Sequence, residues 1–156
     1  MYGLLSILGA FNILLAINVS HPYVLPLNII KPTSFYGMRI HPISKKNKLH
    51  QGIDLAAKIG TPVRAVAYGE VIFSGAYQGY GQLVSIYHAN GYTSHYAHLS
   101  KETVKLGEVV KPAQIIGEVG NTGISTGSHL HCELRKEGKS LDPSILLQMV
   151  KARSYE

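Results

Sequence analysis

GTPVRAVAYGEVIFSG, residues 60–75, has a looser second copy further along the chain in GEVVKPAQIIGEVGNTG, residues 107–123. Each copy reads as a glycine, a valine-bearing strand, a turn, and a second apolar strand that ends in glycine. Both are rich in β-branched residues and are broken by turn residues, which is typical of consecutive short strands. Two copies of one β unit predict a compact, mostly antiparallel sheet or a barrel-like sandwich.

The rest of the chain agrees with an all-β fold. QLVSIYH (82–88), YTSHYAHL (92–99) and HLHCELR (129–135) are further strand-like runs. Asn90-Gly91 lies between the first two and is a strong hairpin signal, because both residues accept positive φ. Helical periodicity occurs only near the end, where Asp142 or Ser144 can start a short C-terminal helix.

Composition limits the class of protein. The chain has 156 residues, of which 46% are hydrophobic and 15% charged, so it suits one domain with a core. A single cysteine excludes a disulfide framework and a zinc site of several cysteines. The net charge of +6 favours an anionic partner, such as nucleic acid, an anionic membrane or an acidic wall polymer. The basic cluster Lys45, Lys46 and Lys48 lacks an accompanying aromatic stripe, so we expect no nucleic-acid partner.

The amino terminus differs from the rest. Residues 2–19 contain no charge, and the first lysine is Lys31. A spanning helix needs about 20 mainly apolar residues, so the segment is marginal in length. It also lacks the basic start of a secretory signal. We expect residues 1–20 to be an export signal or membrane anchor that attaches the chain through residues 2–19. A buried helix of the domain is the alternative.

The histidines carry the strongest chemical signal. His129 and His131 lie two apart in a strand-like run, so both project to one face, while Cys132 points to the other. His50 and Asp54 lie close together in the chain, with a glycine between them that allows a bent path. Imidazole and carboxylate are both zinc ligands. Together with His131 they would leave a fourth position for water, as in a catalytic zinc site.

A further pair of histidines lies in SHYAHLS, residues 94–100. On a regular strand Tyr96 and His98 share one face, while His95 and Ala97 share the other. Only one of the two histidines can therefore join the cluster easily. The alternation by itself does not choose between them.

Several ordered motifs extend over most of the chain: FYGMRIHP (35–42), HQGIDLAA (50–57), GTPVRAVAYGEV (60–71), GYGQLVSIYH (79–88), YAHL (96–99), GNTGISTGSHLHCEL (120–134) and LDP (141–143). Between residues 34 and 143 the chain resembles the lysostaphin-type (LytM-domain) zinc metallopeptidases, which cut peptide cross-links in bacterial cell walls. The resemblance implies an antiparallel sheet with a substrate groove over one Zn²⁺ ion.

The resemblance also implies residue roles. His50, Asp54 and His131 match the zinc ligands, and His98 and His129 match the catalytic histidines, which leaves His95 as an exposed or packing residue. The chain has no HExxH motif and hence no glutamate placed as general base. We therefore expect one of the two catalytic histidines to accept a proton from water. The other would stabilise the oxyanion or protonate the leaving amine.

Other positions carry weaker expectations. Arg39 and Tyr96 are candidate substrate contacts; Arg39 is suited to a substrate carboxylate, with a structural salt bridge as the alternative. Glu133 shares a face with His131 and is a candidate partner for its second ring nitrogen, unless it points outward into solvent. Cys132 stands where the family usually has an aromatic residue, and we expect a small buried hydrophobe. Ala113 replaces a usual glycine, which predicts a changed turn type.

The glycine-rich loop GNTGISTG (120–127) lacks the lysine and the following helix of a P-loop. We expect it to form a flexible wall of the groove, directly before the HLH run, rather than a phosphate site.

These observations predict four parts: an apolar signal or anchor (1–20), a lead-in (21–33), a zinc peptidase domain (34–145) and a C-terminal tail (146–156). The predicted protein is a zinc metalloendopeptidase of the bacterial cell envelope, with one Zn²⁺ per chain and with peptidoglycan cross-links or stem peptides as substrate. One alternative is a non-catalytic member of the fold that binds the wall or activates another hydrolase. Another is a metallopeptidase with a protein substrate.

Overall fold

The computed structural model describes residues 23–41, 43–146 and 148. In chain order its elements are β1 (Pro32–Ser34), β2 (Gly37–Ile40), β3 (Asn47–His50), β4 (Ile53–Ala56), β5 (Pro62–Arg64), β6 (Gly69–Tyr77), β7 (Gly81–Tyr87), η1 (Ala89–Gly91), β8 (Tyr92–Glu102), β9 (Val109–Val110), β10 (Ile115–Val119), β11 (His129–Lys136) and β12 (Lys139–Leu141). The prediction of an all-β fold is confirmed.

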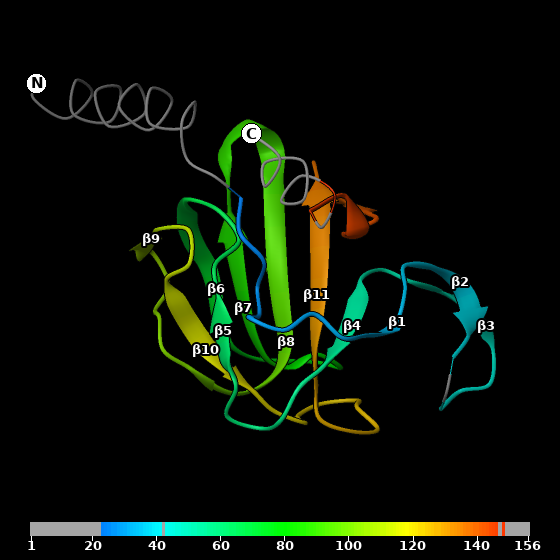
Figure 1. Ribbon diagram of the computed structural model, residues 1–156. Coiled ribbons are helices and arrows are strands. Elements are labelled where there is room, and N and C mark those ends of the chain that lie inside the picture. The colour runs from blue at the N-terminus through cyan, green and yellow to red at the C-terminus, as the bar shows by residue number, and fades with distance from the viewer. Residues whose placement is uncertain (1–22, 42, 147, 149–156) are drawn as a thin grey trace, which may run out of the picture.

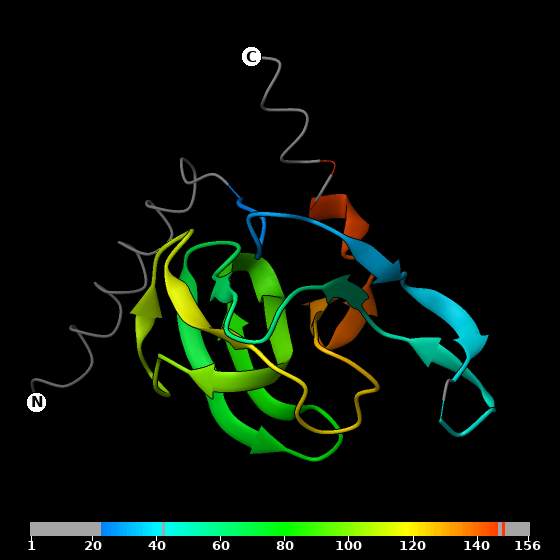
Figure 2. The ribbon, with the colours of Figure 1, turned by 60° about the horizontal axis from the view of Figure 1, so that its bottom comes forward.

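Most of the strands join one curved antiparallel sheet (Figure 1). Among the described residues this sheet has ten strands, with the order β1-β4-β11-β8-β7-β6-β9 along its main path. The long strand β8 also pairs with β10, and β10 pairs with β5, so these two strands form a second layer over the main sheet. β2 and β3 form a separate two-stranded sheet that projects beside β1 and β4 (Figure 2).

The two copies of the repeat pair with each other. The first strand of the early copy, β5, pairs with the second strand of the late copy, β10. The second strand of the early copy, β6, pairs in turn with the first strand of the late copy, β9. Each copy thus completes the hydrogen bonds of the other, and apolar residues of all four strands are buried, among them Val63, Val71, Val110 and Ile116. The repeat therefore contributes to both layers: β6 and β9 end the main sheet, and β5 and β10 form the second layer.

The core lies between the layers. Cys132 on β11 and Tyr96 on β8 are cross-strand partners, and both are buried in it. The Tyr96 hydroxyl accepts hydrogen bonds from the Val66 amide at 3.0 Å and from Ser94 Oγ at 2.9 Å. Burial raises the pKa of the Cys132 thiol to about 12. Since the thiolate is the reactive form, Cys132 is an inert core residue, as expected.

Two turns were predicted from the sequence: a hairpin at Asn90-Gly91 and an altered turn at Ala113. Asn90 has a φ of 60° and Gly91 a φ of 75° in the turn between β7 and β8, so the hairpin prediction is confirmed. In the second turn the Gln114 amide donates to the Lys111 carbonyl at 3.1 Å, and Ala113 has a φ of 68°. A type II turn requires this positive φ at its third position. The expectation that Ala113 changes the turn type is therefore wrong; the alanine adopts the conformation that suits glycine.

Ala113→Gly is expected to stabilise the protein by about 0.5–1 kcal/mol. Glycine relieves the left-handed conformation of an L-residue, and this gain outweighs the extra entropy of the unfolded chain. Urea unfolding at equilibrium measures the change. The control is Ala76→Gly at an exposed position of β6, which removes strand propensity without relieving strain. A lower unfolding free energy for Ala113→Gly would contradict the prediction.

The ends of the chain are only partly described. The Ser144 amide donates to Asp142 Oδ1 at 2.9 Å, and residues 144–146 are helical, so Asp142 caps the predicted C-terminal helix. The predicted signal or anchor at residues 1–20 lies outside the described residues, as does most of the tail at 146–156. Within the described part of the chain, no helix has the length and apolarity needed to cross a membrane.

Candidate metal centre

Three strands bring His50, Asp54 and His131 together. Asp54 on β4 and His131 on β11 are cross-strand partners, so their side chains lie next to each other on one face. His50 ends β3 and reaches the same place through a tight turn at Gly52. A Cβ atom on Gly52 would lie 2.5 Å from the Cys132 carbonyl oxygen and 2.8 Å from His131 Cε1. Close approach to β11 therefore excludes any side chain there.

The three side chains fit one metal ion. His131 Nδ1 lies 2.7 Å from Asp54 Oδ1, and His50 Nε2 lies 3.2 Å from each of these two atoms. Ligand atoms of a tetrahedral zinc ion, at bond lengths near 2 Å, lie about 3.3 Å apart. Imidazole nitrogens and a carboxylate oxygen are also the ligand types that zinc prefers. The structure thus assembles the three predicted ligands in a set that can hold one metal ion.

Hydrogen bonds on the far side of each imidazole fix its orientation. His50 Nδ1 donates to the Phe35 carbonyl at 2.7 Å, and His131 Nε2 donates to Glu133 Oε1 at 3.0 Å. In the tautomers that a bound metal ion requires, these contacts would leave the lone pairs of His50 Nε2 and His131 Nδ1 free for the ion. This is the arrangement of a histidine whose outer nitrogen is held by a carbonyl or carboxylate while the inner one binds metal.

Glu133 belongs to a buried polar network behind His131. Its side chain is 1% exposed, so the alternative of an outward, solvated glutamate is excluded. Besides the His131 bond, Glu133 accepts hydrogen bonds from the Tyr80 hydroxyl at 2.6 Å and from Arg135 Nε at 2.8 Å. Its Oε2 also forms an ion pair with Arg135 Nη2 at 2.6 Å. Burial opposes ionisation of Glu133, but these donors outweigh it and lower the pKa of the carboxyl to about 2.

The sequence reasoning missed Tyr80 and Arg135. Arg135 lies two residues after Glu133 on the same strand face, and this spacing was an available signal for the ion pair. Tyr80 comes from the end of the loop before β7, and no local pattern connects it with β11.

Charge is concentrated at the ligands. Burial raises the pKa of Asp54, but hydrogen bonds from His131 and His50 lower it well below its usual range, so Asp54 is ionised. Burial likewise disfavours charge on His131, whereas Asp54 and Glu133 raise its pKa to about 9. Two carboxylates therefore favour a positive charge at this position, which is also the position of a bound cation.

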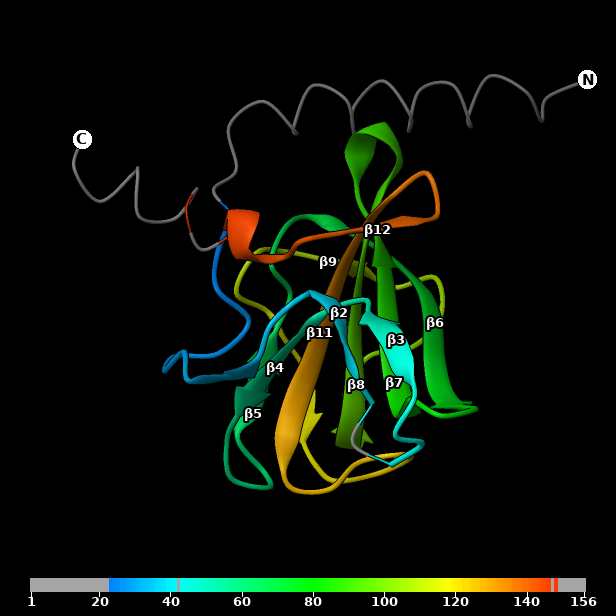
Figure 3. The same cartoon turned by 90° about the vertical axis from the view of Figure 1, so that its right-hand side faces the viewer.

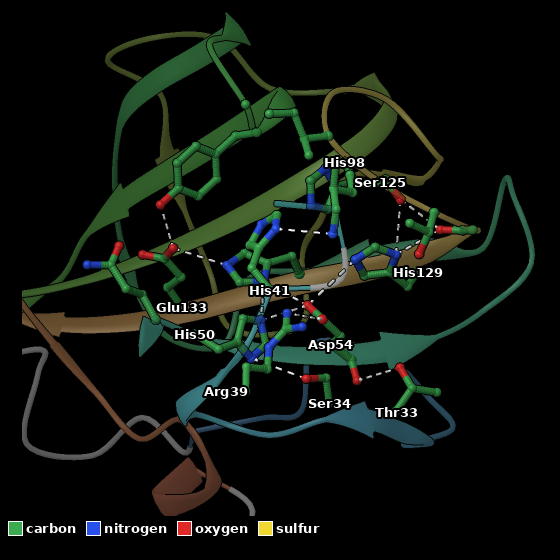
Figure 4. A pocket seen from close by; sticks show the side chains of 18 of the residues that line it. Thr33, Ser34, Arg39, His41, His50, Asp54, His98, Ser125, His129 and Glu133 are labelled. Carbon is green, nitrogen blue, oxygen red and sulfur yellow. Dashed lines mark hydrogen bonds and ion pairs between the residues drawn. The ribbon is translucent and has the colours of Figure 1, made fainter. Parts of the chain in front are cut away.

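His98 and His129 lie beside the three ligands (Figure 4). Their ring centroids are 4.8 Å apart, and His129 Nε2 lies 3.5 Å from Asp54 Oδ1. His98 Nδ1 donates to the Thr122 carbonyl at 2.7 Å, and His129 Nδ1 donates to the Gly127 carbonyl at 2.8 Å. In both rings Nε2 is left as the nitrogen available for proton transfer. Burial lowers the pKa of His98 to about 4, so the ring is neutral near pH 7.

An irregularity in β8 gives His98 its direction. Regular alternation would turn His98 toward the core with Tyr96. Instead His98 has a φ of 59°, and the pairing of β7 with β8 shifts register between Gln82 and Val84. The shift turns His98 into the groove. His95 bonds Ser85 Oγ at 2.7 Å and does not line the groove, so it is a packing residue, as expected.

The five side chains lie in a groove with a volume of about 670 Å³. The loop at residues 124–128 lines one wall of the groove, as predicted for the glycine-rich segment, and residues of the β2–β3 sheet line another. Figure 3 draws the backbone of both segments. Arg39 lines the groove, and its Nη2 lies 3.6 Å from Asp54 Oδ2. Tyr96 is fully buried in the core, so the expectation that it contacts substrate is wrong.

The groove thus holds a candidate metal site with three protein ligands and two adjacent histidines, which is the arrangement of a catalytic rather than a structural metal site. Residues 48–143 match the model of Peptidase family M23, and the chain belongs to this family.

Relatives and solved structures agree with the family assignment. The chain is 48% identical over 118 residues to the DD-carboxypeptidase/endopeptidase Mpg of Neisseria meningitidis serogroup B; the match covers 76% of this chain and 27% of that protein. It is 34% identical to a zinc-containing peptidase from Vibrio cholerae, with a TM-score of 0.73 over 78% of this chain and 39% of the other. The catalytic domain of lysostaphin from Staphylococcus simulans is also 34% identical, with a TM-score of 0.69 over 76% of this chain and 92% of the domain. The chain thus spans about a quarter of the meningococcal relative.

Glu133→Gln is expected to weaken zinc binding by about 10- to 100-fold, because the neutral amide no longer holds the charged acceptor opposite His131. Competition with a chromophoric chelator measures the affinity. Glu70→Gln, at an exposed position of β6, is the matched control and should leave the affinity unchanged. Both variants are compared well below their unfolding temperatures, since Glu133→Gln also leaves Arg135 without its charged partner. An unchanged affinity for Glu133→Gln would refute the role of this contact.

Proposed function

We propose that this chain is a zinc-dependent endopeptidase that cleaves peptide bonds in bacterial peptidoglycan. The observation that carries the proposal is the convergence of His50, Asp54 and His131 with His98 and His129 on one groove of an M23 domain. The activities named for the meningococcal relative and for lysostaphin support it. The proposed non-catalytic alternative is disfavoured because the chain retains all five residues.

In this proposal His50 Nε2, Asp54 and His131 Nδ1 hold the zinc ion. Zinc, when bound, acts as a Lewis acid that polarises the scissile carbonyl and lowers the pKa of water. Asp54 is engaged at its second oxygen by Arg39. Glu133 also lines the groove, but its carboxylate is bound by His131, Tyr80 and Arg135, so it is not free to act as a general base.

His98 and His129 are therefore the proton carriers. Each donates Nδ1–H to a backbone carbonyl, which fixes the ring and leaves an Nε2 lone pair on the groove side. One Nε2 accepts the proton of the attacking water, and the protonated ring can pass it to the leaving amine. The other ring, when it is protonated at Nε2 as an imidazolium, donates a hydrogen bond to the carbonyl oxygen and stabilises the charge that develops there.

The cell envelope is the proposed location. The net charge of +6 would concentrate the chain on anionic wall material, and the uncharged segment 2–19 would direct export or membrane attachment. We propose one Zn²⁺ per chain and no nucleic-acid partner.

Incubation of the purified chain with isolated sacculi tests the proposal. Mass spectrometry of the soluble products is expected to reveal new free amines from cleaved peptide bonds, and the masses identify the bond. A chelator should abolish the release, and added zinc should restore it, because apo protein lacks the Lewis acid. Intact sacculi in the presence of stoichiometrically zinc-loaded protein would favour a wall-binding module instead.

A further inference from the structure

Arg39 holds unused hydrogen-bond donors inside the groove. Its Nε is buried and has no hydrogen-bond partner among the described residues. Its single ionic contact is Nη2 with Asp54 Oδ2 at 3.6 Å, which is longer than a hydrogen bond. A guanidinium carries five N–H donors, and a buried donor without a partner is unfavourable enough to require an explanation. If Arg39 served only as a structural salt bridge to Asp54, most of the N–H donors of its guanidinium would be left without an acceptor.

A second cation lies next to Arg39. Lys48 on β3 is its direct cross-strand partner, so the two side chains share one face of the β2–β3 sheet. His50 follows Lys48 by two residues and points to the metal centre, so this shared face is the one that borders the groove. Both Arg39 and Lys48 line the groove, and Lys48 has no ion pair within the described residues. Like charges placed directly opposite each other destabilise a two-stranded sheet, which makes the pair costly in the absence of an anion.

Nothing on this wall neutralises the two cations. Residues 37–50 contain no aspartate or glutamate. The acidic residues that line the groove are Asp54 and Glu133. Asp54 lies among the candidate metal ligands, and Glu133 is bound by Arg135. This end of the groove is therefore positively charged, exposed at Lys48, and open to an anion from outside the chain.

We infer that Arg39 and Lys48 form a carboxylate-binding subsite that selects peptides with a free carboxylate near the cleaved bond. The planar guanidinium matches a carboxylate with two parallel hydrogen bonds, and the lysine adds a mobile positive charge. The subsite rests on the proposed function, since it names the feature of the peptide substrate that this groove recognises. It distinguishes stem peptides with free carboxylates from amidated peptides and from neutral bridges.

Cross-linked muropeptide dimers test the subsite. One portion keeps its carboxylates, and a second is converted to primary amides with carbodiimide and ammonia. For the zinc-loaded chain, amidation is expected to lower kcat/KM by about tenfold or more, mainly through KM. In Lys48→Gln and Arg39→Gln the ratio of kcat/KM for the unmodified dimer to that for the amidated dimer should fall toward one. Among the described residues the ion pairs of Asp54 are with Arg39 and histidines and not with Lys48, so Lys48→Gln also separates the subsite from an effect on the metal centre. Lys46→Gln changes an exposed lysine just before β3 that does not line the groove, and this variant should keep the full preference.

Binding of both dimers to zinc-loaded His129→Ala protein is measured alongside, so that the result does not depend on cleavage. Weaker binding of the amidated dimer, lost in Lys48→Gln on the same background, supports the subsite even if no dimer is cleaved; in that case only the proposed function fails. Equal binding or equal cleavage of the two dimers overturns the subsite and leaves the proposed function standing. A preference that persists in Lys48→Gln and Arg39→Gln also overturns it.

Discussion

His131→Ala is expected to abolish zinc binding and peptidoglycan hydrolysis together. The substitution removes one of three ligands and leaves Asp54 and Glu133 without the imidazole that bridges them at 2.7 and 3.0 Å. The loss of affinity should exceed the roughly 100-fold that follows from losing an outer partner of a ligand. Metal content after dialysis and release of products from sacculi are the two measurements.

His95→Gln is the matched control for this variant. His95 lies directly opposite Glu133 on β8, but its hydrogen bonds go to Ser85 and Thr93, away from the ligands. The control should keep zinc and activity. If His131→Ala protein still bound one equivalent of zinc tightly, the ligand assignment would be wrong.

His129→Ala has the second large effect, and it should separate chemistry from metal binding. The ring lies next to Asp54 but is not one of the three ligands. Zinc content should therefore persist while kcat falls by about 100- to 10,000-fold, the usual contribution of a positioned proton carrier. Steady-state kinetics on muropeptide dimers and metal analysis of the same sample test both halves of the prediction.

His98→Ala gives the companion measurement. A similar loss of kcat with zinc retained is expected, because its Nε2 borders the same space and its ring lies 4.8 Å from that of His129. If either variant kept a kcat within about threefold of the parent chain, that histidine would have no role in proton transfer.

Side-chain alternation predicted β11 correctly and β8 incorrectly. On β11 the residues His129 and His131 face the groove while Cys132 enters the core, as a regular strand requires. On β8 the same rule groups His98 with Tyr96, yet His98 lines the groove and Tyr96 is buried. The difference arises from the register shift with β7, and a shift that depends on a neighbouring strand leaves no trace in the local sequence.

The candidate site was predictable as a set of residue types, but its supports were not. Histidine and aspartate at short spacings indicated the metal ligands, and Glu133 could be named from its strand face. Tyr80 reaches the site only through tertiary packing, and its hydroxyl lies 2.6 Å from Glu133. Arg39 was a candidate from the sequence, but its neighbour Asp54, at 3.6 Å, was not predicted. Likewise, the internal repeat indicated β-structure, whereas the pairing of each copy with the other required the three-dimensional structure.

The two copies of the repeat contain none of the candidate site residues. None of the five histidine and aspartate residues of the candidate centre lies within 60–75 or 107–123; they precede, separate or follow the two copies. The repeat is thus a structural scaffold, and the segments before, between and after its two copies carry the candidate catalytic and metal-binding residues. The two meet at Thr122, near the end of the second copy, whose carbonyl fixes His98 Nδ1 and whose hydroxyl donates to the Leu99 carbonyl. Substitutions elsewhere in the repeat are expected to alter mainly the stability of the fold. A shift of the Thr122 backbone would instead move the His98 ring directly, because the Thr122 carbonyl accepts its Nδ1–H.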